Sequence, residues 1–460
     1  MRVVTDVRLL PPDAPGRIAD HDELHARPVA PITVPAMVTQ LAVVTAGHAA
    51  AEELAHLRGL AVGAGLPPVG EPDAGLTLPL AGGAVLTWER HAEYSLYSVL
   101  QPLDVATLPG AEAGGAEPDL LALVPLPAGW LAGVPGRTVA AVHVVLLPSA
   151  RHPDDARDGG TDGGRAADDA AVAVANELLG PGRLLGSRIK GGAARLYTTY
   201  RLRADGTSRF LVLCDDVTPG RAGRIAASLL DAERYRMLAL LGYPLARRLV
   251  PRLGELEDRL AELTRAIEDP ARDDHALLDD IVALAAQVET EIAAQGSRFS
   301  AALAYFSIVE QRVEDLRGTS HPGLMGVFTF LQRRLLPAMA TVATAARRLD
   351  ELSERVARTA DLLRTRVEVA TEAQNQDLLR ELRRGQAVQL RLQETVEGLS
   401  IVAISYYAVG LIGYLAKGLK ATGAHLDVER TMALSLPLVL VGLWLLRRRV
   451  SRRVHGAGEE

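Results

Sequence analysis

The pattern of apolar and polar residues divides this chain into three regions. Between residues 36 and 217, short apolar and β-branched runs alternate with turns that contain Gly, Pro or Asp, which is typical of strands. From Pro219 onward, apolar residues recur every three or four positions among Ala, Arg and Glu, as in amphipathic helices. Two uncharged apolar segments follow at 398–416 and 432–446. The pattern predicts an α+β domain, then long coiled-coil-like helices, then a C-terminal hairpin of two hydrophobic helices.

The α+β region is predicted to form one domain, residues 36–217, preceded by an N-terminal arm, residues 1–35. The runs expected to be strands are 37–46, 76–80, 84–90, 93–101, 137–148, 184–190, 194–203 and 208–215, with helices at 48–61 and 168–179. Between the last two strands, Asp205-Gly206 is a strong hairpin signal. The stretch at about 154–167 is rich in Gly and Asp and low in apolar residues, so it is expected to be a mobile loop. Calcium binding is the disfavoured alternative, because the stretch lacks the alternation and the terminal Glu of a calcium loop.

Residues 218–336 are expected to form a helical bundle or coiled coil. Two series of apolar residues alternate spacings of four and three, which is the pattern of a coiled-coil seam. The first series is Leu249, Leu253, Leu256, Leu260, Leu263 and Ile267, and the second is Leu277, Ile281, Leu284 and Val288. The pattern allows packing of helices within one chain and pairing between copies of the chain, and both interpretations stay open here.

A stalk helix is predicted over residues 337–397, because no proline occurs between Pro337 and Pro437. Continued to the end of the first apolar segment, this helix would hold about 80 residues and extend about 120 Å. One small domain cannot bury a helix of that length. We therefore expect the stalk to pack against helices of residues 251–336, against copies of itself, or both.

The two apolar segments are predicted to cross a membrane, because a bilayer core of roughly 30 Å needs about 20 helical residues. They would be joined by an outer loop, residues 417–431, and followed by a basic tail, residues 447–460, that carries five arginines. Lys and Arg are enriched on the cytoplasmic side of membrane proteins, so both termini are expected in the cytoplasm. The alternative is a pair of buried core helices in a soluble domain.

Polar residues along the predicted stalk are spaced three and four apart, so they would form one stripe on the helix. This polar stripe consists of Gln386, Gln389, Gln393, Glu397, Ser400 and Tyr407. Two interpretations are open: the stripe lines a pore in a symmetric oligomer, or it faces the cytosol and ends at the lipid headgroups. Under either interpretation, Ser405, Gly410 and Gly413 are small residues that permit close approach of neighbouring helices.

Candidate catalytic chemistry is sparse in this sequence. The segment HDELHARP, residues 21–28, has the histidine spacing of zinc proteases, but Asp22 replaces the Glu that acts as general base. Prolines follow at once and disfavour the helix that this motif requires. We therefore expect an ordered turn in which Glu23, His25 and Arg27 tie the arm to the domain, with zinc catalysis as the alternative. No phosphate-binding glycine loop or Ser-His-Asp spacing is present, so we expect no enzyme activity, no catalytic residues and no cofactor.

Composition limits which partners the protein is expected to bind and in which compartment it is expected to lie. The net charge of −6 gives no argument for nucleic-acid binding. The single cysteine, Cys214, excludes an internal disulfide and a cysteine zinc cluster, and it fits a reducing compartment. We therefore expect the lipid bilayer and copies of the chain itself as partners, and no nucleic acid.

Five segments carry a resemblance to a known family. They are HDELHARP at 21–28, RFSAALAY at 298–305, RRLLPAM at 333–339, LLRTRVEV at 362–369 and QLRLQETVEGLSIVAISYY at 389–407. Through them the chain resembles the bacterial predicted membrane-anchored protein family, domain of unknown function 3422. The resemblance implies a bacterial inner (cytoplasmic) membrane location. It implies no catalytic residues, because none are defined for that family.

The layout of the chain is similar, more remotely, to CorA-type magnesium channels. Those channels have a cytoplasmic α/β domain, a long stalk helix, two C-terminal spans and a basic tail, and they assemble as pentamers. Their Gly-Met-Asn signature is missing here, where the first span ends with GLIGYL at 410–415, and the outer loop offers only Asp427 and Glu429 as acidic residues. The resemblance implies a homo-oligomer and, as a candidate function, an ion (divalent cation) channel or transporter.

Two other functional classes remain as alternatives. The first is a membrane-anchored scaffold or regulatory protein, in which the hairpin serves only as an anchor and the soluble domain binds a partner. The second is a membrane-bound hydrolase, which no catalytic spacing, nucleotide loop or metal cluster in the sequence supports.

Overall fold

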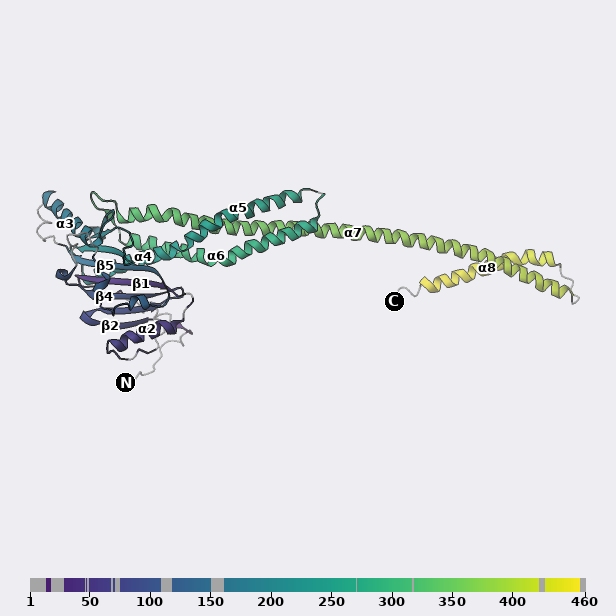
Figure 1. The fold of residues 1–460 in the computed structure, drawn as a ribbon. Helices are drawn as coiled ribbons and strands as arrows, with labels where there is room; N and C mark the ends of the chain where they lie inside the picture. The colour runs from purple at the N-terminus through teal and green to yellow at the C-terminus, as the bar shows by residue number, and fades with distance from the viewer. Residues whose placement is uncertain are drawn as a thin grey trace, which may run out of the picture. The chain divides into compact units, whose positions relative to one another are not determined.

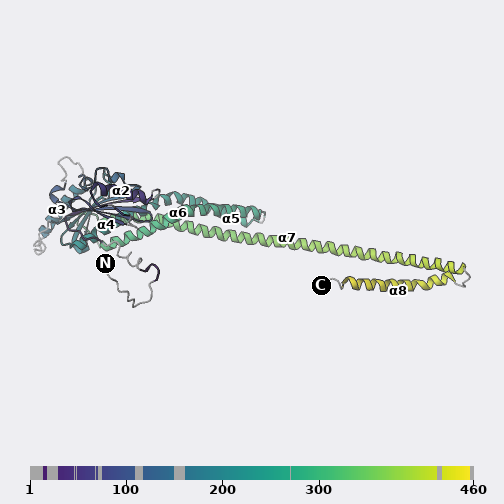
Figure 2. The ribbon, with the colours of Figure 1, turned by 90° about the horizontal axis from the view of Figure 1, so that it is seen from below.

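Figure 1 shows the computed structural model of the chain, and Figure 2 shows it from a second direction. The structure describes residues 14–17, 29–45, 47, 49–67, 69–70, 75–108, 118–149, 161–269, 271–316, 318–421 and 427–455. The segment HDELHARP, with Glu23, His25 and Arg27, lies outside these residues. The chain divides into a first compact unit, residues 1–270 and 279–359, and a second, residues 271–278 and 360–460.

Long helices account for most of the chain after the strands. The α-helices are α2 (Ala50–Gly63), α3 (Thr161–Leu179), α4 (Pro219–Leu240), α5 (Gly242–Ile267), α6 (Asp274–Leu316), α7 (Val327–Ala421) and α8 (Val428–His455). Short 3-10 helices lie at Ala81–Gly83, Val105–Thr107, Leu121–Leu123, Leu131–Gly133 and Lys190–Gly192. Strands give way to helices between Cys214 and Pro219, where the composition of the sequence changes.

The first unit contains one nine-stranded sheet with the order β2-β3-β4-β1-β5-β8-β7-β6-β9. The strands are β1 (Ala36–Val44), β2 (Gly75–Pro79), β3 (Val85–Arg90), β4 (Tyr94–Pro102), β5 (Arg137–Pro148), β6 (Leu185–Ile189), β7 (Ala194–Thr198), β8 (Ser208–Cys214) and β9 (Thr319–Ser320). β5 and β8 pair in parallel, and the other neighbouring strands run antiparallel. The predicted α+β class is confirmed, and β9 is an additional strand from the connection between α6 and α7.

The β7–β8 hairpin forms where Asp205-Gly206 predicted it. Gly206 has a φ of 79°, a conformation that glycine adopts without strain. The Asp205 carboxylate accepts hydrogen bonds from the backbone N–H and the hydroxyl of Thr207, at 2.8 and 2.7 Å. The connection between the two strands is therefore ordered by a short side chain and a glycine, as the dipeptide indicated.

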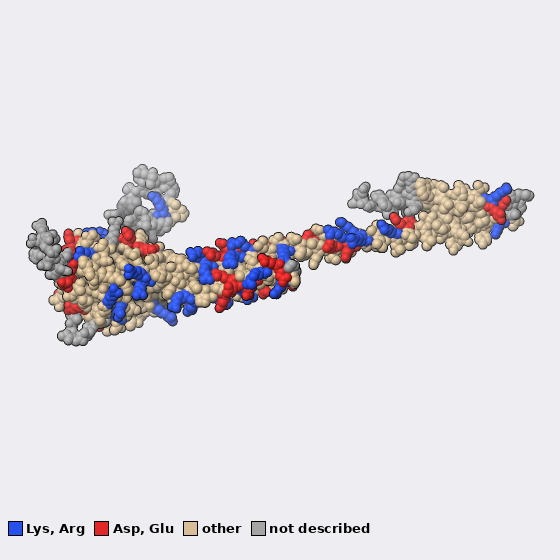
Figure 3. Space-filling model, turned by 90° about the horizontal axis from the view of Figure 1, so that it is seen from above, with Lys and Arg blue, Asp and Glu red and all other residues tan. Residues whose placement is uncertain are grey.

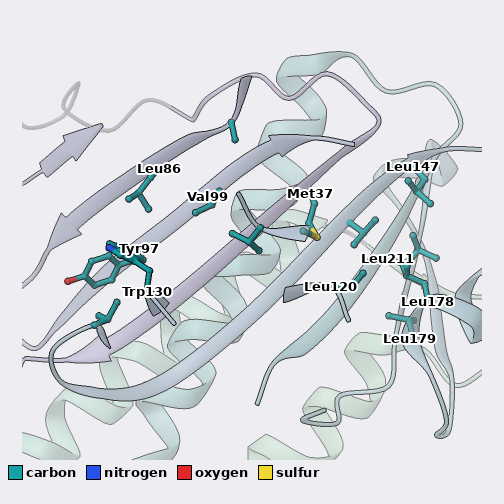
Figure 4. Packing of buried hydrophobic residues seen from close by; sticks show 14 of the residues in the cluster. Met37, Leu86, Tyr97, Val99, Leu120, Trp130, Leu147, Leu178, Leu179 and Leu211 are labelled. Carbon is teal, nitrogen blue, oxygen red and sulfur yellow. The ribbon is translucent and has the colours of Figure 1, made fainter. Parts of the chain in front are cut away.

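Helices cover both faces of the sheet. On one face, apolar side chains of α2 and α3 join alternate residues of the strands in one buried cluster, part of which is shown in Figure 4. On the other face, α4 packs together with the end of α6 and the start of α7. Successive strand side chains point to opposite faces, so Val144 and Val145 of β5 enter different clusters. This double burial explains the uninterrupted apolar run in β5.

The predicted mobile loop at about 154–167 is wrong in its second half, because α3 begins at Thr161. The sequence of α3 is rich in alanine, which has the highest helix propensity. Ala171, Ala175 and Leu178 are buried in the cluster on the sheet, so packing adds to that propensity. Residues 150–160 lie outside the described residues.

A buried polar pair lies between β1 and β5. Thr39 Oγ1 and His143 Nδ1 are 2.9 Å apart, and His143 is 0% exposed. His143 Nε2 has no hydrogen-bond partner among the described residues. Burial disfavours the charged imidazolium and thereby lowers the pKa of His143 from 6.5 to about 4.

We therefore expect the first unit to lose stability as the pH falls from 6.5 to about 4. In this range His143 is protonated in the unfolded chain and neutral in the folded one, so protonation favours unfolding. By linkage, the loss is about 3 kcal/mol. Urea unfolding at a series of pH values measures this loss. His143→Gln should unfold with a flatter pH dependence than the unsubstituted chain, and an unchanged pH dependence would contradict the assignment.

α5, α6 and the first part of α7 lie side by side in both views (Figures 1 and 2). Arg348 of α7 pairs with Glu257 of α5 at 2.7 Å. The predicted seam residues are buried in this single chain, namely Leu249, Leu253, Leu256, Leu260, Leu263, Leu277, Ile281, Leu284 and Val288, whereas Ile267 is half-buried. On α7, buried residues recur every three or four positions at Met339, Val342, Ala345, Leu349, Leu352 and Val356. In the structure, the two predicted series pack within one chain, as the first of the two interpretations predicted.

α7 begins at Val327 and continues through Pro337, so the helix starts before residue 337, where the stalk was predicted to begin. Proline removes one backbone hydrogen bond and crowds the preceding turn, which usually ends a helix. Here Leu335 and Met339 on either side of the proline are both buried. We attribute the continuity of α7 to this packing, which favours helical backbone on both sides of Pro337.

The helices of the predicted hairpin are longer than expected. α7 extends to Ala421 and α8 begins at Val428, so most of the predicted loop 417–431 is helical. The Asp427 carboxylate accepts hydrogen bonds from the backbone N–H groups of Glu429 and Arg430, at 3.1 and 3.4 Å, and thereby caps the start of α8. α8 also includes the beginning of the predicted basic tail, up to His455.

Candidate functional site

The part of α7 in the second unit carries the predicted polar stripe. Every residue from Glu368 to Ser400 is exposed. The exposed residues therefore include Gln386, Gln389, Gln393, Glu397 and Ser400, and Tyr407 further along the helix is exposed as well. The Ser400 hydroxyl donates to the carbonyl of Val396 at 2.8 Å. The stripe thus lies on a helix that the rest of the second unit does not cover at these positions.

Apolar residues next to the stripe form a second feature, which the sequence analysis did not single out. Eight residues of α7 alternate spacings of four and three, as the a and d positions of a coiled coil do. We call them the stalk seam: Leu378, Leu382, Gly385, Gln389, Leu392, Val396, Leu399 and Ala403. Its leucines and valine are between 57 and 72% exposed. The heptad spacing could have revealed the seam, but Gly385 and Gln389 interrupt its apolar character.

The stripe and the seam share one side of α7. Gln389 belongs to both, and in the heptad of the seam Gln386, Gln393 and Ser400 occupy the flanking e positions. Glu397 occupies a b position, at the edge of this side. The sequence reasoning therefore placed most of the polar residues correctly on one helix face, while it missed the apolar residues beside them.

Charged residues of the stalk lie away from the seam. The outer b, c and f positions hold Arg380, Arg383, Arg384, Arg391, Glu394 and Glu397. Among the a, d, e and g positions from Leu378 to Ala403, only Glu381 is charged. In the view of Figure 3, charged side chains on the long helix give way to an uncharged surface over the apolar parts of α7 and α8, and charged side chains appear again where the two helices are joined. One side of the stalk is thus free of charge almost throughout.

α8 packs on the end of α7 within the second unit. A Cβ added to Gly413 would lie 2.7 Å from the Met432 sulfur, so a glycine at this position permits the close approach. Ser405 and Ala416 are buried, whereas a Cβ at Gly410 would meet no described atom within 4 Å. At 100° per residue, Ser405 and Ala416 lie about 120° around α7 from the seam, whereas Gly413 falls on a d position of the same heptad. α8 therefore contacts α7 beyond the seam, and the seam residues from Leu378 to Leu399 stay exposed.

A second candidate site is a surface groove in the first unit with a volume of about 1020 Å³. Ala55, Gly59 and Gly63 of α2 line one wall, spaced four residues apart so that they share a helix face. Prolines and leucines of residues 79–81 and 125–127 line the rest. Trp130 and His56 also line the groove, and their rings stack with centroids 4.4 Å apart. The groove is mostly apolar, and small residues at i, i+4 and i+8 were the sequence signal for it.

A cluster of charged side chains lies at the carboxyl ends of the parallel strands β5 and β8. Arg195 is buried and donates to Asp215 and Asp168, at 3.2 and 3.3 Å, and to the Ser149 hydroxyl. Asp168 also accepts from Arg188 at 2.7 Å. Because each arginine is already paired with carboxylates of the chain itself, the cluster joins α3 to the sheet and offers no free cation to an anionic ligand.

No cluster of three or more His, Cys, Asp or Glu side chains is positioned to hold a metal ion in the described ranges, which leave out residues 18–28. Cys214 is buried, and burial raises the pKa of its thiol to about 12. A thiol with so high a pKa is a poor nucleophile near neutral pH.

The fold defines an α+β protein with a long helical region and two C-terminal helices that are long and apolar enough to cross a membrane. The family model described as "Protein of unknown function (DUF3422)" matches residues 12–454, so the chain belongs to this family. No curated protein and no solved structure matches the chain.

Proposed function

We propose that this protein is a homo-oligomeric protein of the bacterial inner membrane with a CorA-like layout, and that its stalks surround a polar path for ions. Two apolar helices at the end of the chain support membrane insertion. An α+β domain followed by a long helix and these two helices supports the layout. The protein would act without catalysis.

Charge around the two helices supports the orientation. Arginines occupy positions 447, 448, 449, 452 and 453 after the apolar part of α8, and Arg380, Arg383, Arg384 and Arg391 precede the apolar part of α7. The connection between the helices carries Lys417, Lys420 and Arg430, offset by Asp427 and Glu429. By the bias of Lys and Arg towards the cytoplasm, both termini would be cytoplasmic and the connection would lie outside.

The observation that carries the proposal is the exposed side of α7, where polar and apolar residues run next to each other. Burial of the apolar seam against another surface is favourable, whereas Gln386, Gln393 and Ser400 require hydrogen bonds to water or to other polar groups. Both needs are met when several copies surround an axis, with seams in contact and polar side chains facing a hydrated centre. Such a ring of oxygen ligands suits a partly hydrated cation.

This proposal predicts that two substitutions in the stripe change ion flux. Removing the carboxylate in Glu397→Ala, or the hydroxyl in Ser400→Leu, should change the flux through purified protein in vesicles about tenfold, which corresponds to roughly 1.4 kcal/mol in the barrier. The matched control is Glu394→Ala, which removes an equally exposed carboxylate from the f position and should leave flux unchanged. Unchanged flux in both stripe variants would remove the stripe from the proposal.

The size of the solubilised complex decides between this proposal and its alternative. The alternative is a membrane-anchored scaffold or regulatory protein, and the groove beside Trp130 supports it as a place for a ligand or a partner segment. Light scattering with the detergent subtracted measures the protein mass of the complex. A ring-sized assembly of about five copies favours the ion path, because a monomer or dimer with two spans per chain cannot enclose one. A monomer or dimer would favour the alternative.

A further inference from the structure

We infer that the stalk seam is the surface through which copies of this chain associate, as parallel helices in register. This inference rests on the proposed homo-oligomer and specifies its contact. The seam comprises Leu378, Leu382, Gly385, Gln389, Leu392, Val396, Leu399 and Ala403.

The seam has the side chains of a coiled-coil interface and no cover from the described residues. Leu392 and Leu399 occupy d positions and Val396 an a position, a combination that parallel coiled coils use and that favours two strands. The three side chains are 65, 72 and 57% exposed. By contrast, the seam residues of α5 and α6 are buried within the chain. The chain thus covers one heptad series itself and leaves the other open.

The distribution of charge points to an identical copy as the partner. In a parallel assembly of identical helices, a g position of one helix lies beside an e position of the next, so charges of one sign at both positions would repel. Here these positions hold Leu, Gln, Val, Thr and Ser, with Glu381 as the only charge. The arginines and the other glutamates lie at outer positions. An acidic partner would instead be expected to bind through the arginines, which lie off the seam.

The membrane hairpin explains the parallel direction. Copies inserted in the same bilayer with the same orientation present their stalks side by side and pointing the same way. The shared membrane also raises the effective concentration of one stalk for another. Gln389 at an a position adds specificity, because polar side chains in a seam meet one another only when the helices are in register.

The packing of α8 is compatible with this contact. Ser405 and Ala416 are buried in the hairpin about 120° around α7 from the seam, and α8 reaches the heptad of the seam only further along, at Gly413. Tyr406 continues the seam at its next d position and is 77% exposed.

Disulfide formation between single introduced cysteines tests the contact in the full-length chain in membranes. Same-residue disulfides require Cβ atoms about 4 Å apart, and in parallel helices in register the equivalent Cβ atoms come closest at the a and d positions. We expect Leu392→Cys, Val396→Cys and Leu399→Cys to form dimers at least tenfold faster than the outer-position controls Arg391→Cys and Glu394→Cys. The unsubstituted chain serves as the background, because its Cys214 is buried.

The outcomes separate this inference from the ion path. Fast cross-linking that repeats every three and four residues, together with an absence of flux, would uphold the seam and overturn the ion path. Flux in a complex whose cross-linking shows no such periodicity would overturn the seam alone. Cross-linking that peaks at outer positions, or no cross-linking at any position, would also overturn the seam and point to a different partner on this face.

Discussion

Replacing Glu53 with alanine is expected to destabilise the first unit by about 3–5 kcal/mol, the cost of breaking a buried ion pair by removing one partner. Glu53 lies on α2 and is 0% exposed. Its carboxylate accepts hydrogen bonds from the Trp88 indole at 2.8 Å and from Arg90. Burial, and next the charge of Glu53, raise the pKa of the neighbouring Tyr97. The substitution would therefore leave the buried indole N–H of Trp88 and the half-buried guanidinium of Arg90 without this carboxylate.

Hydrogen exchange of β1 and β5 measures this destabilisation, because amides of core strands exchange mainly through global unfolding. Exchange should accelerate about a hundredfold or more in Glu53→Ala, since 1.4 kcal/mol corresponds to a factor of ten. The matched control is Glu52→Ala on the same helix, where the side chain is exposed and the exchange rate should stay within a few fold. Equal exchange in the two variants would show that the Glu53 contacts do not stabilise the sheet.

A second large effect is expected at Gly223 in α4. A Cβ at this position would overlap the backbone carbonyl oxygen of Ala30 and would lie 3.4 Å from Cγ1 of Val29. The chain entering the sheet is fastened nearby, where the Ile32 N–H donates to the carbonyl of Pro219 at 2.9 Å. Because a backbone atom cannot turn away as a side chain can, Gly223→Ala must move either the entering chain or α4. We expect a loss of about 3 kcal/mol or more, at the upper end for overpacking.

Thermal unfolding of the solubilised chain, together with exchange at the Ile32 amide, tests this expectation. Gly254→Ala is the matched control, because Gly254 is also inside a helix but a Cβ there would meet no described atom within 4 Å. That control should be stabilised by up to about 1 kcal/mol, the difference in helix propensity between Gly and Ala. If Gly223→Ala were as stable as Gly254→Ala, the contact between α4 and the entering chain would be wrong.

The candidate site was only partly visible in the sequence. The polar stripe and the small residues of the hairpin could be predicted, because helical spacing places residues on faces without knowledge of their neighbours. The sequence could not show that Gly413, rather than Gly410, lies against Met432, since this depends on how α8 sits on α7. The groove beside Trp130 was missed for a similar reason, because its walls come from segments far apart in the chain.

The sequence by itself determined the local elements of this protein: the strands, most of the helices and the two apolar helices at the end. These depend on periodicity and on the length of apolar runs, which are properties of neighbouring residues. The tertiary structure decided which surfaces are covered. Two heptad series look alike in the sequence, yet the series beginning at Leu249 is buried within the chain, whereas the stalk seam beginning at Leu378 is exposed. A heptad pattern indicates that a helix can pack through one face. Whether that face is buried within the same molecule depends on where the rest of the chain lies.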